Sequence, residues 1–483
     1  MSLKNKTIQG IAWSSLDSFV NLGIQFIAGI ILARLLTPKE FGLIGMLVFF
    51  IAISQSIIDS GFTQALIRKK NIKQSDYSTV FYFNLIIGFV IYASLYFSAE
   101  AISHFFNEPQ LKDLLQVLGL EVIIVSFTII HTAKLTREIN FKLQTKITII
   151  ASVLSGAIGI GMAYMGYGVW SLVGKTLSMR LFVSILLWIW NRWLPTLEFD
   201  KESFKSMFSF GSKLMLSGLI DNIYRNIYNL IIGKFFSAQA LGFYTRADQF
   251  KKLPAESINT IISRVSYPVL SQLQDDDEKL KSGYKQIIKS TMLVTFFLML
   301  SMAAIAEPMI IVLIGEKWLP AVEYLQLLCF AGMLFPLHSL NLNILKVKGR
   351  SNLFLKLEIA KKIIAIPVII VGIYFGIRYL LIGMIVSSLI AYFLNSFYSG
   401  RLINYPAREQ LRDIAPLFLI SAASATTVFG IGELLSSGYF VILPIQIITG
   451  IFTFIILNEI LKTEEYLFIK NTLLNLYKNH KAK

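Results

Sequence analysis

The chain has 483 residues, of which 55% are hydrophobic and only 15% are charged, and its net charge is +16. A soluble domain typically carries about 25% charged residues, so we exclude a soluble globular protein. The basic residues lie in short segments between apolar runs, where they orient a membrane protein, so nucleic acid is not expected as a partner. A single cysteine, Cys329, excludes a disulfide framework and a cysteine metal site.

Long apolar runs predict helices that cross a bilayer, because a helix satisfies its backbone hydrogen bonds internally. About fourteen spans of roughly 20 residues are expected. They lie at 10–34, 42–66, 77–99, 112–133, 145–165, 168–190, 206–234, 247–272, 286–306, 321–345, 356–376, 378–399, 413–433 and 439–461. Basic residues crowd alternate connecting segments, such as 68–73 and 134–146. Both termini are therefore expected on the cytoplasmic side of the membrane.

An internal repeat organises these spans. The segment 34–43, RLLTPKEFGL, recurs as KFFSAQALGF at 234–243. Each half then holds about six spans, an even number, so the halves share one orientation and form a parallel repeat. The predicted domains are an N-terminal lobe at 1–195, a C-terminal lobe at 196–402, and two further spans with a basic cytoplasmic tail at 403–483. Two such lobes are expected to enclose a central cavity suited to alternating access.

Polar residues form stripes along two of the predicted spans. Residues four apart share one face of a helix. On the first span these are Asp17, Asn21 and Gln25, and on the seventh they are Ser217, Asp221 and Arg225, with Lys213 extending the second stripe. Both stripes are expected to line the cavity and bind substrate. The alternative for Asp221 and Arg225 is an ion pair that neutralises itself.

Other ionisable residues interrupt the spans singly. Arg264 in the eighth span suits a phosphate, or else it reaches the nearby membrane surface. Glu121 in the fourth span is a candidate for coupling to an ion, and interhelical hydrogen bonding is the alternative. Asp17 and Asp59 are further candidates for ion coupling. Lys175 and Arg180 on the sixth span are expected to line the cavity or to reach lipid headgroups.

Motifs for enzymatic chemistry are missing from the sequence. It holds no P-loop, nucleophile elbow, Gly-rich dinucleotide turn or metal-ligand cluster. The outer connecting segments are too short to carry the catalytic groups of a membrane polymerase or ligase. We therefore expect a protein that is not an enzyme and has no cofactor or metal. Its energy would come from a proton or sodium gradient, or from the gradient of the substrate itself.

Several short motifs resemble a known family. They are 33–42 (ARLLTPKEFG), 59–61 (DSG), 65–67 (ALI) before a basic loop, 105–109 (FFNEP), 137–141 (REINF) and 166–172 (GYGVWSL). Together they are similar to the polysaccharide transport family of the multidrug/oligosaccharidyl-lipid/polysaccharide flippase superfamily. The branch that they most resemble is that of the colanic-acid and teichuronic-acid exporters, which take part in lipopolysaccharide and exopolysaccharide biosynthesis.

The resemblance implies an all-α membrane protein of about fourteen helices, with two six-helix lobes and two C-terminal helices. It also implies a flippase that moves undecaprenyl-pyrophosphate-linked oligosaccharide from the cytoplasmic to the outer leaflet by alternating access. The implied partners are the polyprenyl-linked glycan, membrane lipid and the polysaccharide polymerase machinery. Arg225, Lys213 and Arg264 fit the family's cationic cavity by position. Three acidic residues depart from that pattern, Asp17, Asp59 and Asp221.

Two alternatives remain open. A cation-coupled multidrug efflux transporter has the same superfamily fold, but the motifs quoted above favour the polysaccharide branch. A membrane scaffold that transports nothing would gain no advantage from charged residues inside the bilayer.

Overall fold

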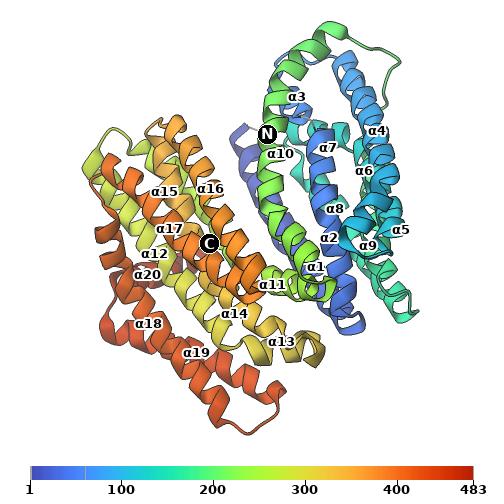
Figure 1. Ribbon diagram of the computed structural model, residues 1–483. Helices are drawn as coiled ribbons and strands as arrows, with labels where there is room; N and C mark the ends of the chain where they lie inside the picture. The colour runs from blue at the N-terminus through green and yellow to red at the C-terminus, as the bar shows by residue number, and fades with distance from the viewer. Residues whose placement is uncertain (1–2, 60, 482–483) are drawn as a thin grey trace. The chain divides into compact units, whose positions relative to one another are not determined.

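The computed structural model describes residues 3–59 and 61–481, and over these residues it contains helices and no strand (Figure 1). The helices pack into two compact units, Met1–Gly242 and Phe243–Lys483. The all-helical fold class is confirmed. The domain boundaries after residues 195 and 402 come from the repeat and stay predictions.

Unit 1 is built from ten helices or short helical segments among the described residues. They are α1 (Leu3–Leu35), α2 (Pro38–Asp59), α3 (Phe62–Arg68), α4 (Gln74–Phe106), α5 (Leu111–Leu118), α6 (Leu120–Ser126), α7 (Ile129–Arg137), α8 (Phe141–Tyr164), α9 (Trp170–Asn191) and α10 (Lys201–Phe235). Helix α8 packs against both α1 and α9, and α10 packs against α2. An aromatic core that includes Phe62, Phe81 and Trp193 joins α3, α4 and the segment before α10.

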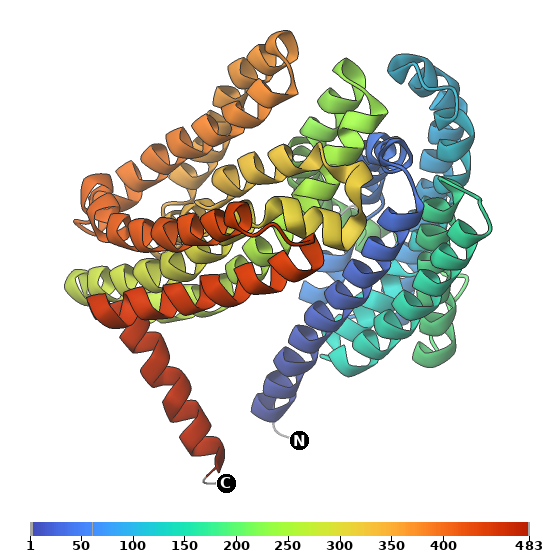
Figure 2. The same ribbon diagram turned by 90° about the horizontal axis from the view of Figure 1, so that it is seen from below.

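Helix α11 (Ala238–Gln272) crosses the boundary, so its first residues, as far as Gly242, belong to unit 1 and the rest to unit 2. Unit 2 is built from this helix and the elements that follow it. These are α12 (Asp277–Ala304), α13 (Ala306–Ile314), the 3-10 turn η1 (Glu316–Trp318), α14 (Ala321–Gly332), α15 (Phe335–Val347), α16 (Ser351–Phe375), α17 (Ile377–Leu402), α18 (Ala407–Leu434), α19 (Tyr439–Leu461) and α20 (Glu464–Lys481). Figure 2 shows α20 projecting away from the other helices of this unit.

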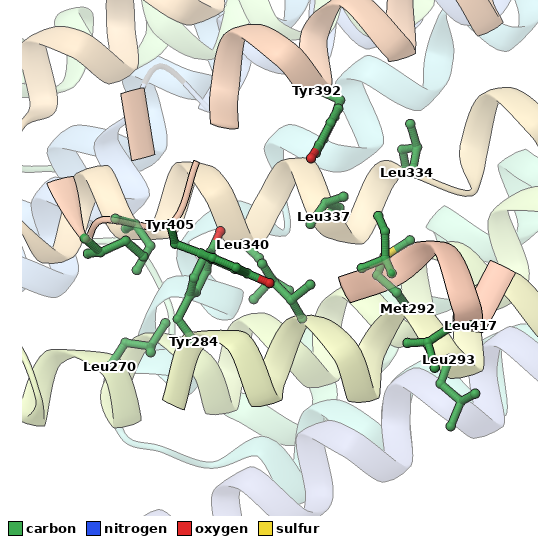
Figure 3. Close-up of a cluster of buried hydrophobic side chains, with 14 of the residues drawn as sticks. Leu270, Tyr284, Met292, Leu293, Leu334, Leu337, Leu340, Tyr392, Tyr405 and Leu417 are labelled. Carbon is green, nitrogen blue, oxygen red and sulfur yellow. The ribbon is translucent and has the colours of Figure 1, made fainter. Parts of the chain in front are cut away.

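The core of unit 2 lies where α12, α15, α17 and α18 meet. Tyr284 of α12, Leu337 and Leu340 of α15, Tyr392 of α17 and Leu417 of α18 are all buried there (Figure 3). Burying large apolar side chains against one another stabilises the unit by about 1.5–3 kcal/mol for each fully buried residue in water. Within a bilayer, where lipid is also apolar, close packing carries more of that role.

Each predicted span falls on helical residues, but the bounds differ by up to nine residues, as at the starts of α11 and α12. The spans predicted at 42–66, 112–133 and 321–345 are divided between shorter helices. Ten helical stretches of the described residues are long and apolar enough to cross a membrane. The expected spans at 10–34, 206–234, 247–272 and 356–376 fall outside that set, although each is helical. In the last of these, the ionisable residues Glu358, Lys361 and Lys362 interrupt the apolar run. The count of fourteen therefore stays a prediction.

The repeated motif marks the starts of α2 and α11. The Glu40 N–H donates to Thr37 Oγ1 at 3.4 Å, and the Thr37 N–H donates to Glu40 Oε2 at 2.6 Å, which is a capping box. In the second copy the Ala240 N–H donates to Ser237 Oγ at 3.0 Å. The motif is conserved between the two copies because both begin a helix in the same way.

The two copies of the motif also pack against each other. A Cβ atom placed on Gly42 would lie 1.6 Å from the carbonyl oxygen of Ala238, and one placed on Gly242 would lie 1.8 Å from that of Pro38. The backbones approach so closely that only glycine fits at either position. The contact is reciprocal, as expected when matched parts of an internal repeat meet.

Candidate functional site

A buried polar cluster joins three helices of unit 1. Glu121 is only 3% exposed, and its Oε1 accepts hydrogen bonds from Gln55 Nε2 at 2.8 Å and from Arg180 Nε at 2.7 Å. The three side chains come from α6, α2 and α9. Glu121 lies in the first turn of α6.

Glu121 lies two residues after a local irregularity in the helix at Gly119. The expected span at 112–133 is divided into α5, α6 and α7, and Gly119 separates α5 from α6. Gly119 also lies close to the Tyr92 ring and the Leu115 carbonyl, where a Cβ atom would have little room. Gly119 keeps right-handed helical angles and its N–H donates to Leu115 O at 2.8 Å, so α5 runs on into α6 in nearly the same direction.

The cluster neutralises a charge that would be costly alone. A buried carboxylate is tolerated in an apolar interior when it is paired and hydrogen-bonded. The Arg180 side chain is 40% exposed and carries five N–H donors, so it can hold Glu121 and also meet an acceptor outside the core. This pairing supports interhelical hydrogen bonding by Glu121, and its ion-coupling role stays a prediction.

The polar stripe of α1 lies against α8. Thr148 Oγ1 donates a hydrogen bond to Asp17 Oδ1, and Ser152 Oγ donates one to Asn21 Oδ1. Gln25 is exposed and donates from Nε2 to Asn21 Oδ1 at 3.3 Å. The three residues thus share a face as expected, and two of them join α1 to α8. Their roles in substrate binding and ion coupling stay predictions.

The polar stripe of α10 is more exposed. Arg225 Nε lies 2.8 Å from Asp221 Oδ2, and their side chains are 69% and 52% exposed. The i,i+4 ion pair is therefore formed, and both partners remain open to a ligand. Lys213 is exposed on the same helix. Next to the stripe, Asn222 donates a hydrogen bond to Ser56 Oγ and ties α10 to α2.

Of the two remaining candidates, the structure describes the side chain of Asp59 but not that of Arg264. Asp59 is the last residue of α2, and its Oδ1 accepts a hydrogen bond from Thr63 Oγ1 of α3. Arg264 lies within α11, but its side chain is outside the described part of the structure. In the described residues, no group of three or more His, Cys, Asp or Glu side chains is placed to hold a metal ion.

Two arrangements at the ends of α3 and α4 were not foreseen from the sequence. Arg137 donates from Nη1 to the carbonyl oxygens of Leu66 at 2.8 Å and Lys69 at 2.5 Å, and from Nη2 to that of Lys70 at 2.9 Å. It therefore caps the C-terminus of α3 from α7. The signal was present, because Arg137 begins one of the motifs that carry the family resemblance, but sequence alone does not reveal its acceptors.

The second arrangement ties α10 to the start of α4. The Asp76 carboxylate, which is fully buried, accepts from Lys69 Nζ at 2.8 Å and from Ser203 Oγ. The segment before α10 is held as well, since the Asp200 N–H donates to Thr79 Oγ1 at 2.8 Å. These contacts fix the direction in which α10, with its polar stripe, leaves the segment after α9.

Comparisons with known proteins agree with this architecture. A family described as "Polysaccharide biosynthesis protein" matches residues 31–323. The teichuronic acid biosynthesis protein TuaB of Bacillus subtilis is 28% identical and is aligned over 73% of both chains. The lipopolysaccharide biosynthesis protein WzxC of Escherichia coli is 25% identical over 77% of this chain and 76% of its own. The succinoglycan biosynthesis transport protein ExoT of Rhizobium meliloti is 26% identical over 68% and 67%.

Solved structures share the fold at low sequence identity. The lipid II flippase MurJ in an inward closed conformation superposes with a TM-score of 0.75 at 14% identity, covering 93% of this chain and 98% of its own. An inward-facing transporter of the multidrug resistance MATE family gives a TM-score of 0.61 at 16% identity, over 81% of this chain and 98% of its own. The expected flippase-superfamily fold is confirmed.

Proposed function

We propose, from the premise that this chain belongs to the polysaccharide biosynthesis protein family, that it is a flippase for a lipid-linked polysaccharide precursor. It moves an undecaprenyl-pyrophosphate-linked oligosaccharide from the cytoplasmic to the outer leaflet of a bacterial inner membrane by alternating access. Both termini lie in the cytoplasm, and the product passes to the polysaccharide polymerase machinery.

The family membership carries this proposal. The family match runs from residue 31 to residue 323, which is more than half of the chain. The relatives in Bacillus subtilis and Escherichia coli are named for the biosynthesis of teichuronic acid and lipopolysaccharide, and the one in Rhizobium meliloti is named as a transport protein. A fold shared with a lipid flippase suits the same task.

The charge distribution supports an anionic headgroup as the cargo. A pyrophosphate that leaves the aqueous phase needs cationic partners, and arginine binds phosphate oxygens with two parallel N–H donors. Arg225 and Lys213 on α10 are exposed, and Asp221 holds the Arg225 guanidinium in place. We assign these residues, with the side chain of Arg264, to the binding of the pyrophosphate and its sugars. Asn21 and Gln25 on α1 are assigned to hydroxyl groups of the glycan.

Energy for the cycle comes from a proton or sodium gradient or from the substrate's own gradient. Asp17, Asp59 and Glu121 are the carboxylates assigned to such coupling. The chain acts as a transporter and catalyses no covalent step.

The decisive measurement is the lipid-linked sugar content of cells depleted of the protein. We expect a complete repeat unit on undecaprenyl pyrophosphate to accumulate, by mass spectrometry of extracted lipids, while surface polysaccharide falls. Unchanged lipid-linked sugars together with increased sensitivity to cationic dyes would instead identify an efflux transporter.

A pair of variants tests the α10 stripe. Arg225→Gln removes the exposed guanidinium, and we expect it to reduce export about tenfold or more, since charge-assisted contacts to phosphate are strong. Lys205→Gln on the same helix removes an exposed positive charge near its start and serves as the matched control. Both variants should reach the membrane in normal amounts. Normal export by Arg225→Gln would remove this residue from the binding site.

A further inference from the structure

A hollow in unit 2 lies between the start of α16 and the end of α17. Its volume is about 420 Å³. Its lining includes Arg350, just before α16, Asn352 and Leu353 of α16, and Tyr398, Arg401 and Leu402 of α17. Helices α15, α16 and α17 pack side by side (Figure 1). The hollow belongs to none of the polar stripes or clusters described above.

Both arginines of the hollow are available to an anion. Arg350 and Arg401 are exposed, and among the described residues neither forms an ion pair with a carboxylate. The Arg401 guanidinium lies over the Phe397 ring with its carbon 4.0 Å from the centroid, which holds it in position and leaves its edge N–H groups for an acceptor. Two guanidinium groups beside one hollow are suited to phosphate oxygens.

The start of α16 adds to this positive character. The turn between α15 and α16 has the same backbone hydrogen bond as the turn between α7 and α8 in unit 1. The Asn140 N–H donates to Leu135 O at 2.9 Å, and the Arg350 N–H donates to Leu345 O at 2.7 Å. In unit 1, Asn140 caps α8 by accepting from the Leu143 N–H at 3.3 Å. In unit 2 the cap position is held by Arg350, which makes no side-chain cap. The Leu353 N–H donates to the Arg350 carbonyl oxygen at 3.1 Å, so the helix begins directly beside the hollow. The positive end of the α16 dipole therefore adds to the charge of the two arginines.

The walls that lead to the hollow are apolar and exposed. On α16, a stripe at helical spacing runs through Leu355, Ile359 and Ile363, starting three residues after Asn352. On α17, a second stripe through Phe393 and Phe397 leads to Arg401 in steps of four. Apolar side chains exposed along a membrane helix face lipid chains. A ligand with a charged head and a long apolar tail therefore matches the surface.

We infer that this hollow binds the phosphate headgroup of an anionic lipid, with its chains along α16 and α17. The inference does not depend on the proposed cargo, because both membrane phospholipids and the polyprenyl carrier present the same phosphate chemistry. The hollow lies at the start of α16 and the end of α17, next to basic connecting segments that the proposed orientation places on the cytoplasmic side.

The test is native mass spectrometry of the purified full chain titrated with dioleoyl-phosphatidylglycerol and, separately, with zwitterionic dioleoyl-phosphatidylcholine. The double variant Arg350→Gln/Arg401→Gln removes both guanidinium groups. The matched control Arg408→Gln/Arg412→Gln removes two exposed arginines from the first turns of α18. Size-exclusion profiles and melting curves establish that all three proteins are folded.

We expect the wild-type chain and the control to bind phosphatidylglycerol about tenfold more tightly than phosphatidylcholine, and the double variant to lose that preference. Retention of the preference by the double variant, or an equal loss in the control, would overturn the inference. Competition with undecaprenyl pyrophosphate shows which lipid the hollow binds. Displacement of phosphatidylglycerol at a lower concentration of competitor assigns the site to the carrier lipid, and resistance to displacement assigns it to membrane phospholipid.

Discussion

Replacing Gly42 by alanine tests the reciprocal contact between the starts of α2 and α11. The new Cβ atom would lie 1.6 Å from the Ala238 carbonyl oxygen and 2.4 Å from its carbon, whereas real Cβ contacts essentially never fall below 3.0 Å. The obstacle is backbone, which cannot rotate away as a side chain would. The two helix starts must therefore part by well over an ångström.

The expected loss in the free energy of unfolding is the cost of overpacking minus the gain in helix propensity. Overpacking a tight contact costs typically about 1–3 kcal/mol, and a backbone clash belongs at the upper end of that range. Alanine gains roughly 1 kcal/mol over glycine inside a helix, so the net loss is about 2 kcal/mol. For a unit of this size, that corresponds to a fall in Tm of about 5 °C.

Gly430→Ala provides the matched control. Gly430 lies inside α18, and a Cβ atom there would meet no other atom within 4 Å. The same substitution should therefore stabilise the protein by about 1 kcal/mol and raise Tm by about 2–3 °C. Gly242→Ala, with a Cβ atom 1.8 Å from the Pro38 carbonyl oxygen, should behave like Gly42→Ala.

The assay is the melting temperature of each variant in one detergent, measured as the fraction of monodisperse protein that survives heating. We expect Gly42→Ala and Gly242→Ala to melt at a lower temperature than the wild type, and Gly430→Ala to melt at a higher one. If Gly42→Ala melts at or above the wild-type temperature while the control behaves as expected, the close approach of α2 and α11 does not exist in the protein.

Two further predictions concern buried charges of unit 1. Glu121→Gln should cost about 1.5 kcal/mol, because it removes a charge-assisted hydrogen bond but leaves Arg180, which is 40% exposed, within reach of other acceptors. Adding Arg180→Met should recover most of the lost Tm, and a double variant no more stable than the single one would contradict the pairing. Arg137→Lys should loosen the end of α3, since a lysine cannot reproduce the planar set of donors to three carbonyls. Limited trypsin digestion should then cut after Lys69 and Lys70 several-fold faster than in the wild type, and an unchanged cleavage rate would count against the cap.

The helices themselves could be predicted because a bilayer leaves the backbone few choices. Apolar runs of sufficient length must become helices, and the observed α4 (Gln74–Phe106) and α19 (Tyr439–Leu461) coincide with such runs. The start of α2 could also be found, since Thr37 and Glu40 form the local pattern of a capping box. A structural feature can be predicted from the sequence when the residues that cause it lie close together in the chain.

Contacts between distant segments could not be predicted in the same way. Glu121 and Arg180 were each visible as ionisable residues in an apolar run, but they are separated by 59 positions and meet only because α6 packs against α9. The division of the span at 112–133 into three short helices was hidden too, because no proline marks it. Gly119 gave the one local hint, and a glycine in a membrane helix often has a packing role instead.

The motif at 59–61 illustrates a third situation, in which the sequence shows that a residue matters without showing why. Gly61 has a φ of +67°, which favours glycine. A Cβ atom there would also lie 2.4 Å from the carbonyl oxygen of Gly211. The glycine is required by the turn before α3 and by the close passage of α10. Neither requirement can be deduced before the helices are placed.

Comparing the two copies of the repeat separates what the fold requires from what is particular to each half. Positions that keep their character, such as Gly42 and Gly242, perform the same packing role in both copies. Positions where the residue type differs between the two copies do not perform a shared packing role. Asn140 caps its helix, whereas the Arg350 side chain in the matching turn makes no cap hydrogen bond and lines a hollow. A loss of local stability at a helix start is tolerated more readily where a ligand replaces the cap. The departure from the repeat is therefore itself an argument that an anion binds beside Arg350.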